Sequence, residues 1–456
     1  MASKNGVTSK NHNKMTKVLP RGHKKLLNAW AFYDWANSVY SLTIVSTIFP
    51  IFYGLLFRTA GITHINLLGI PVKSTSVITF VTAWAFAAVV ILSPVLSGIA
   101  DYLGNKKSFM RFFCYLGALS SITLYWFSLE HIYFSLLCYF CGVVGFWGSI
   151  VFYNSYLPDI ALPEQYDAIS AKGYSLGYAG SVILLIFNLI IVLKPEWVGF
   201  ENKSVETTLT TMRISFITVG IWWIIFSAIP FYYLTTYQKE RGKLSRQIFL
   251  NGFKELKKVW QQLTTSKKLK WYLIAFFVYS MGVQTVMLVA TYFGEQEIAW
   301  ASQTESTMGL IISVLIIQVV AIIGAKLTVK AVEAWGNINT LILLNIIWVI
   351  ICVIAFYIHK PFHFYLLATL VGLVMGGIQT LSRSTYAAYL PETNDTTSFF
   401  SFYDITEKIG IVIGMGVYGA IDQYTSNMRN ATLSLLVFFA LGVLLLFKVK
   451  NKKTNP

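Results

Sequence analysis

Acidic, amide and hydroxyl side chains interrupt the first long apolar stretch of the chain. Asp34, Asn37, Ser38 and Ser41 are related by spacings of three and four residues, so on a helix they share one face. A carboxylate that faces lipid is costly, and such a residue usually faces a helix bundle and marks a path for a solute or an ion. Asp34 is therefore a candidate for solute binding or proton transfer. A structural ion pair or a hydrogen-bonded helix contact is the alternative.

Charged residues also stand inside two apolar stretches near the C-terminus. Arg383 lies near the end of one stretch, and the next begins with Asp404, Glu407 and Lys408, where Asp404 and Lys408 have the i, i+4 spacing of a helix ion pair. Because an unpaired charge inside a membrane is costly, we expect Arg383 to pair with Asp404, Glu407 or Asp34. Pairs that break when one end of the protein opens would act as a gate. A permanent network would only stabilise the fold.

A short polar motif joins two further apolar stretches, Ser76–Ala100 and Phe109–Ser128, each long enough to cross a bilayer core of about 30 Å. Its acid stands at a helix end, where it can face the N-terminal N–H groups of another helix. Its glycines allow a tight turn, and its lysines mark the cytoplasmic side. The motif reads Gly98-Ile-Ala-Asp101-Tyr-Leu-Gly104-Asn-Lys106-Lys107.

The second half of the chain carries a weak copy of the first. Gly336-Asn337 follows Gly104-Asn105 by 232 residues, and Tyr389-Leu390-Pro391 follows Tyr156-Leu157-Pro158 by 233 residues. Each offset is about half of the 456 residues. We interpret the chain as two tandem halves in the same orientation, the arrangement of parallel-repeat transporters.

The composition is that of a membrane protein with many spans. Hydrophobic residues make up 55% of the chain, charged residues 12%, and the mean hydropathy is +0.60. Most of the positive charge falls in the segments predicted to be cytoplasmic, so the net charge of +16 follows the positive-inside rule and needs no nucleic-acid partner. The four cysteines lie inside apolar stretches without further ligands, so we expect buried thiols and no metal site.

These patterns predict an all-α membrane protein with 12 transmembrane helices in two six-helix bundles and both termini in the cytoplasm. The first span is expected at Trp30–Phe57 and the sixth at Arg213–Tyr237. Apolar residues recurring every three or four positions around 249–263 predict an amphipathic helix on the inner leaflet. The expected segments are a basic cytoplasmic tail at 1–29, the N-terminal bundle at 30–237, a central cytoplasmic loop at 238–270, the C-terminal bundle at 271–447 and a tail at 448–456.

Several motifs resemble the major facilitator superfamily. The motif of Asp101 is similar to the signature of its loop between spans two and three. The segments Tyr33-Asp34-Trp35-Ala36-Asn37-Ser38, Phe152–Ala161 and Gly376–Ser384 resemble the branch related to the vacuolar autophagy effluxer, which exports amino acids. This resemblance implies two six-helix bundles around a central cavity, with Asp101 facing the start of span eleven. The second-half copy has lost the basic pair, which implies asymmetric gating.

The leading hypothesis is a secondary transporter that moves a small polar or zwitterionic solute by alternating access. If protons drive transport, Asp34 or Glu407 would carry them. Gln284 and Gln379 lie well inside spans, although each alone is equally explained by hydrogen bonds between helices. The residues expected to face the cavity are Tyr33, Asp34, Asn37, Tyr40, Asn154, Gln284 and Gln379. Those expected to control the inner gate are Gly98, Asp101, Gly104, Lys106, Lys107, Arg383, Asp404, Glu407 and Lys408.

Two other classes of function are open at this stage. A membrane-embedded lipid-modifying enzyme would need a nucleophile and base or a phosphate-binding loop, and no such pattern stands out. A sensor that kept a transporter scaffold would bind a solute without moving it. We expect no enzymatic activity, no cofactor, and a monomer in the lipid bilayer, either of a bacterial inner membrane or of a vacuole.

Overall fold

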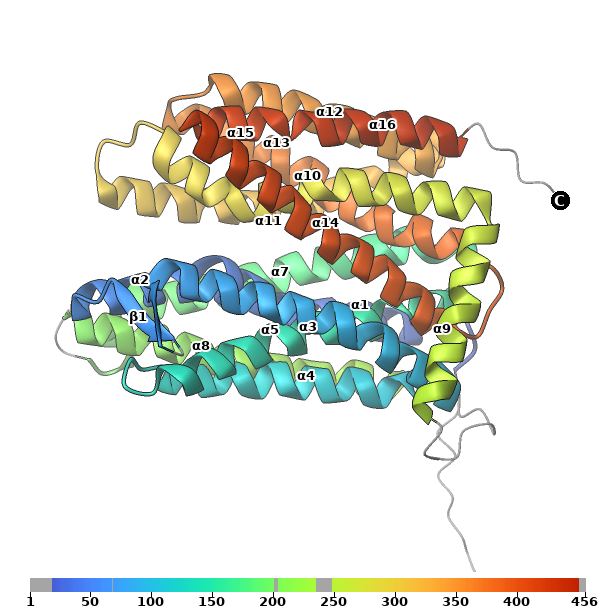
Figure 1. The fold of residues 1–456 in the computed structure, drawn as a ribbon, viewed down its shortest axis with the longest axis horizontal. Helices are drawn as coiled ribbons and strands as arrows, with labels where there is room; N and C mark the ends of the chain where they lie inside the picture. The colour runs from blue at the N-terminus through green and yellow to red at the C-terminus, as the bar shows by residue number, and fades with distance from the viewer. Residues whose placement is uncertain (1–18, 68, 201–203, 235–247, 451–456) are drawn as a thin grey trace, which may run out of the picture.

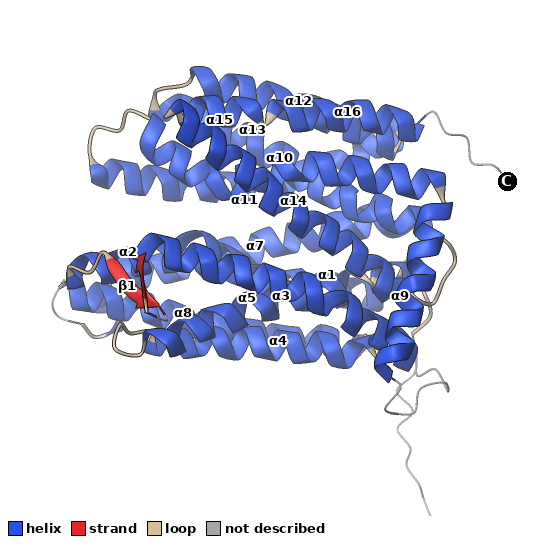
Figure 2. Cartoon of the chain, viewed as in Figure 1, coloured by secondary structure: helices blue, strands red, loops and turns tan. Residues whose placement is uncertain are grey.

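The computed structural model describes residues 19–67, 69–200, 204–234 and 248–450. Parts of the two tails and of the central loop expected at 238–270 therefore lie outside the described residues. The described chain is helical apart from one antiparallel pair of strands, β1 (His64–Leu67) and β2 (Ile70–Lys73) (Figure 2).

The helices form two sets that lie side by side with their axes roughly parallel (Figure 1). The N-terminal set contains α1 (Lys24–Tyr40), α2 (Ile48–Ala60), α3 (Ser74–Leu103), α4 (Lys106–Thr123), α5 (Ile132–Asn154), α6 (Leu157–Ile160), α7 (Tyr166–Leu193) and α8 (Val205–Tyr233). The C-terminal set contains α10 (Lys267–Glu297), α11 (Gln303–Trp335), α12 (Asn337–Tyr357), α13 (Pro361–Tyr389), α14 (Thr396–Thr425), α15 (Met428–Ser434) and α16 (Leu436–Lys450).

Helix α9 (Ile248–Thr265) lies across one end of the molecule, which we call the α9 end (Figure 1). Leu256, Val259 and Leu263 on one face of α9 are buried, and the helix packs against α3. Lys258 donates a hydrogen bond of 2.8 Å to Asp395, in the turn before α14. Helix α9 therefore touches both sets.

Ten of the described helical segments are long and apolar enough to cross a membrane. The other two long helices that we expected to span, α4 and α14, are more polar. Helix α4 begins with two lysines, and α14 contains Asp404, Glu407 and Lys408. Both lie alongside the other helices (Figure 1), and their crossing of the membrane remains a prediction.

The first span, expected at Trp30–Phe57, lies within the candidate span Lys24–Ala60 and is interrupted by a turn of another helix type. Helix α1 begins at Lys24, and a π-helix at Ser41–Thr47 separates α1 from α2. Pro50 has no N–H to donate to the carbonyl group of Ser46, four residues before it, so the α-helical ladder cannot continue there. The N–H of Ile48 instead bonds the carbonyl group of Thr43, five residues back.

Each half has a glycine with positive φ at the equivalent turn, although the two turns differ in ψ, which is +27° at Gly104 and +163° at Gly336. Gly104 ends α3 with a φ of +65°, and Gly336 ends α11 with a φ of +76°, a region that glycine adopts without strain. Asn105 and Asn337 follow these glycines at the starts of α4 and α12. A glycine with positive φ followed by an asparagine therefore recurs at the 232-residue offset seen in the sequence, whereas the rest of the turn geometry is not repeated.

Candidate functional site between the two helix sets

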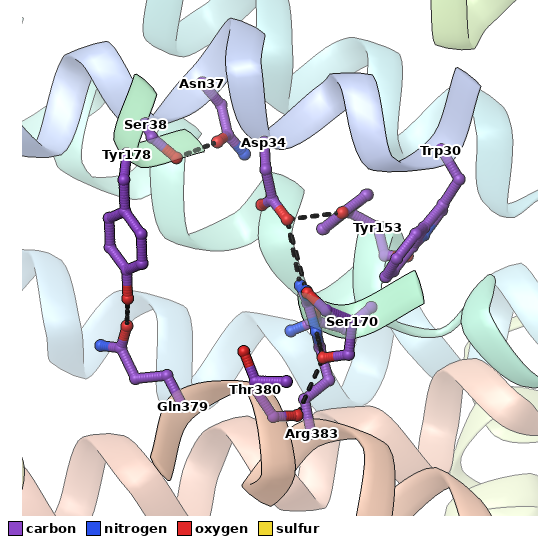
Figure 3. Close-up of polar contacts among 11 residues, drawn as sticks. Trp30, Asp34, Asn37, Ser38, Tyr153, Ser170, Tyr178, Gln379, Thr380 and Arg383 are labelled. Carbon is purple, nitrogen blue, oxygen red and sulfur yellow. Dashed lines mark hydrogen bonds and ion pairs between the residues drawn. The ribbon is translucent and has the colours of Figure 1, made fainter. Parts of the chain in front are cut away.

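Arg383 is the centre of the contact between the two sets. It lies on α13 with 1% of its surface exposed. Its guanidinium group donates hydrogen bonds to Asp34 Oδ2 on α1 at 3.4 Å, to Asn154 Oδ1 on α5 at 3.2 Å, and to Ser170 Oγ and O on α7 at 3.0 Å (Figure 3). All three partners belong to the N-terminal set. Of the three acids considered from the sequence, the partner of Arg383 is thus Asp34.

Aromatic rings surround this ion pair. The guanidinium carbon lies 4.1 Å from the ring centre of Tyr174, 4.9 Å from that of Trp30 and 5.5 Å from that of Tyr153. The Tyr153 hydroxyl group also donates a hydrogen bond of 2.7 Å to Asp34 Oδ2. Ring faces attract a planar cation, and the low local polarity strengthens the ion pair. The buried charges are therefore compensated only while the two sets are in contact.

Asp101 makes a second connection between the sets. Asp101 lies in the last turn of α3. Its carboxylate accepts hydrogen bonds from the backbone N–H groups of Thr397 at 3.2 Å and Ser398 at 2.7 Å, in the first turn of α14. The partial positive charge of a helix N-terminus favours a carboxylate there. Asp101 therefore lies where the resemblance placed it, facing the start of span eleven.

The two lysines of the motif have different partners. The Lys106 ammonium group forms an ion pair with Asp159 and donates to Ser155 O at 2.9 Å and to Thr396 Oγ1 at 3.0 Å, so it bridges the sets. Lys107 instead donates to Leu234 O at 2.6 Å, within the N-terminal set. Gly98 is buried in α3, before the turn at Gly104.

Asp159 pairs with the motif lysine Lys106, whereas Asp167, at the start of α7, contacts the C-terminal set. Its Oδ1 accepts hydrogen bonds from Ser384 at 2.5 Å and from Asn337 at 2.9 Å, both in the C-terminal set. Asp167 lies in the first turn of α7. Helix α7 packs against α11 and α13 rather than against the α3–α4 turn. Asp167 thus adds a fourth connection between the sets at the α9 end.

The charged residues of α14 form a separate cluster. Lys408 Nζ, fully buried, lies 2.8 Å from Asp404 Oδ1 and 2.8 Å from Glu407 Oε2. Gln284 on α10 donates a hydrogen bond of 2.8 Å to Glu407 Oε1. Lys408 Nζ also lies 3.6 Å from the ring centre of Trp147 on α5, in the other set. The Asp404–Lys408 pair follows the helical spacing read in the sequence.

Of the amide side chains expected in the cavity, Gln379 joins the two helix sets, whereas Asn37 makes its hydrogen bond within one helix. Gln379 on α13 accepts a hydrogen bond of 2.5 Å from Tyr178 on α7, so it also joins the sets (Figure 3). Asn37 is buried, and its Oδ1 accepts a hydrogen bond of 3.3 Å from Ser38 on the same helix. Its Nδ2 has no hydrogen-bond partner among the described residues.

Tyr33 and Tyr40 do not face the space between the sets as expected. Both are fully buried within the N-terminal set. Tyr33 packs against Tyr153, and Tyr40 packs against Phe146 and Trp223. The two tyrosines are seven residues apart, so they lie on one face of α1, and that face is turned toward α5 and α8.

Three residues of the site carry no sequence signal strong enough to single them out. Ser170 and Tyr174 lie on α7 among small and aromatic residues that indicate helix packing, and Trp147 lies in an apolar run. The described residues contain no group of three or more His, Cys, Asp or Glu side chains that could hold a metal ion. The arrangement instead offers charged and polar side chains that join the two helix sets.

Comparisons with known proteins agree with this geometry. A family model described as "Vacuole effluxer Atg22 like" matches residues 22–456. The uncharacterized MFS-type transporter YxiO of Bacillus subtilis is 30% identical over 428 residues, which cover 94% of this chain and 95% of YxiO. Autophagy-related protein 22 of Saccharomyces cerevisiae is 24% identical, over 93% of this chain and 90% of that protein.

Solved transporters share the fold. The major facilitator superfamily transporter FucP in its outward conformation superposes with a TM-score of 0.66 at 12% identity, over 94% of this chain and 99% of FucP. A bacterial homologue of the iron transporter ferroportin, in an outward-facing state, gives a TM-score of 0.64 at 12% identity, over 94% and 99% of the two chains. At this identity the likeness concerns the fold alone.

Proposed function

Because this chain belongs to the family of proteins like the vacuole effluxer Atg22, within the major facilitator superfamily, we propose that it moves a small polar or zwitterionic solute by alternating access. It is a multi-pass membrane protein of a transporter family. The observation that carries the proposal is the ion pair of Arg383 with Asp34, which joins the two helix sets through buried charges.

In this proposal the two sets are the two moving bundles, at 30–237 and 271–447. Helices α4 and α14 cross the membrane with the other ten spans, and the α9 end is cytoplasmic, because Lys and Arg concentrate in the segments assigned to that side. The connections made by Asp101, Lys106 and Arg383 lie toward this end and hold it closed. The structure then corresponds to a state open toward the opposite side.

Opening the α9 end requires these connections to break together. Arg383 and Asp34 would then both lose their partner, so another group must compensate their charges or water must hydrate them. A zwitterionic solute offers one group for each charge. This supports a solute that binds near Asp34 and Arg383, alongside the amides Gln379 and Gln284.

Amino-acid efflux fits this chemistry and is our proposed activity. An α-amino acid carries a carboxylate group that Arg383 can bind and an ammonium group that Asp34 can bind. The family model that matches this chain is also named after a vacuole effluxer. If the transport is proton-coupled, Asp34 or Glu407 carries the proton, since both are acids with partly accessible side chains, 10% and 17% exposed.

Transport into proteoliposomes tests the proposal. Purified protein is reconstituted, and uptake of a labelled amino-acid mixture is followed with and without an imposed pH gradient. The wild type and the control Asp422→Asn, at the far end of α14, should accumulate label, and Asp34→Asn should lose most of this uptake. The proposal fails if no amino acid is taken up, or if Asp34→Asn transports like the wild type.

A further inference from the structure

The cluster of Asp404, Glu407 and Lys408 does not balance its charge. Two carboxylates share one ammonium group, and the side chains of Asp404 and Lys408 are only 4% and 0% exposed. A buried charge without a partner costs several kcal/mol, and a titratable group there avoids the cost by changing its protonation. The cluster therefore needs one more positive charge in the state described here.

Among the residues that the structure describes, no nearby group supplies that charge. The titratable side chains that face Glu407 from neighbouring positions are Tyr174 of α7, Tyr279 of α10 and Tyr403 of α14. Tyrosine hydroxyl groups are neutral at physiological pH. Arg383, near Tyr403, directs its hydrogen bonds to the N-terminal set. The charged groups that meet the start of α14 are Asp101 of α3, Lys106 of α4 and Lys258 of α9.

The hydrogen bonds single out one oxygen of the cluster. Both oxygens of Glu407 accept hydrogen bonds, from Gln284 and from Lys408. Asp404 Oδ1 accepts from Lys408, whereas Asp404 Oδ2 is buried and has no hydrogen-bond partner among the described residues. An anionic oxygen in that position is the least stabilised of the four. A metal ion would need several oxygen ligands, and the positive charge of the Lys408 ammonium group would repel it. A proton needs only this one oxygen.

We propose that Asp404 binds one exchangeable proton, which reaches it from the more exposed Glu407 by way of Lys408. On binding, water beside Glu407 supplies the proton, Lys408 takes a proton from Glu407 and gives one to Asp404 Oδ1, the oxygen that it contacts, and rotation of the carboxyl group brings the acidic hydrogen to the Oδ2 position. On release it returns to water. This inference rests on the proposed function and deepens it, because it assigns the coupled proton to Asp404 instead of Asp34 and gives Glu407 the role of entry point.

The position of Lys408 links this proton to the conformation of the protein. Its ammonium group faces Trp147 of the N-terminal set at 3.6 Å from the ring centre. When the sets separate at this contact, water reaches the cluster and stabilises the charged form of Asp404. Separation of α5 from α14 therefore favours release of the proton, and closure favours its uptake.

Infrared spectroscopy of the purified protein in lipid vesicles tests the proton count without any solute. The carbonyl stretch of protonated carboxylic acids is measured at neutral pH in the wild type and three variants. Asp404→Asn removes the proton site, and Glu407→Gln removes the excess charge, so each should lose the signal of one carboxylic acid. Lys408→Met leaves two buried acids without a cation, so it should gain the signal of one.

Thermal unfolding identifies variants that fail to fold, and Asp422→Asn should leave the carbonyl signal unchanged. The inference is overturned if Asp404→Asn keeps the wild-type signal, or if Glu407→Gln does so while folding normally. The infrared measurement counts protonated carboxylic acids and needs no solute, so a result that contradicts the proton site does not contradict alternating access. Failed amino-acid transport likewise leaves the proton count readable.

Discussion

Replacing Arg383 with Met should open the α9 end. The substitution keeps a long, flexible side chain but removes every hydrogen bond that Arg383 makes to Asp34, Asn154 and Ser170. Removing one partner of a buried ion pair costs about 3–5 kcal/mol, because the other charge stays buried and unpaired. In an open state water relieves this cost, so the closed state alone is penalised. About 3 kcal/mol corresponds to a shift of roughly a hundredfold in the ratio of the two states.

Thiol labelling at position 380 measures this shift. Thr380 is fully buried on α13, where its carbonyl oxygen accepts a hydrogen bond from Ser170 of α7 (Figure 3). Its own hydroxyl group has no hydrogen-bond partner among the described residues, so Thr380→Cys loses no bond. In a background without the four native cysteines, the labelling rate follows the open population when opening is rare. Arg383→Met should raise this rate about a hundredfold.

Two further variants make the test specific. Asp34→Asn combined with Arg383→Met removes both charges, so labelling should return most of the way toward the wild-type rate. Arg429 is also buried and paired, but its partner Glu297, at 2.8 Å, lies in the same set. Arg429→Met should therefore lower thermal stability without faster labelling. An unchanged rate in Arg383→Met, or a double variant no slower than the single one, would refute the gate.

Three smaller predictions follow from other contacts. Asp101→Ala removes the acceptor for two N–H groups at the start of α14, so it should destabilise the closed state by about 1–3 kcal/mol. Thiol labelling at position 380 should therefore become faster, and an unchanged labelling rate would contradict this prediction. Gly324→Ala should lower thermal stability by about 1–3 kcal/mol, because its Cβ would overlap the carbonyl group of Leu373, whereas the control Gly416→Ala meets no atom and should be neutral or stabilising. The hydrogen bond to Asp395 raises the pKa of Lys258, so the pair stabilises the protein below the ordinary lysine pKa and loses this effect as pH rises through the raised value. Since Lys258 is largely exposed, Lys258→Gln should cost less than about 1 kcal/mol at neutral pH, and no difference should remain at strongly alkaline pH.

The sequence predicted much of the architecture because a bilayer places a strong constraint on length and polarity. Apolar stretches long enough to span are visible without knowing their neighbours, and ten of them are helices of that kind in the structure. Local spacing was equally informative within one helix. Asp404 and Lys408 are four residues apart and form their ion pair, and Gly104 takes the left-handed turn expected between α3 and α4.

For contacts between distant segments, the sequence reduced the number of candidate partners but did not identify the partner. The partner of Arg383 was one of three acids, and the choice of Asp34 joins residues 349 positions apart. The periodicity of α1 placed Asp34 on a polar face but could not show that Tyr33 and Tyr40 turn toward α5 and α8. Nothing in the sequence pairs Arg429 of α15 with a distant segment, yet it donates hydrogen bonds to carbonyl groups at the end of α12, among them Ile358 O at 2.5 Å.

The sequence by itself therefore determined the helices, their repeat and the charges that a membrane requires to be paired. Only the tertiary structure decided which charges meet, because the rotation of each helix about its axis depends on packing against all of its neighbours. That rotation placed Arg383 among groups of the opposite set and left Asp404 Oδ2 without a hydrogen bond from any described residue.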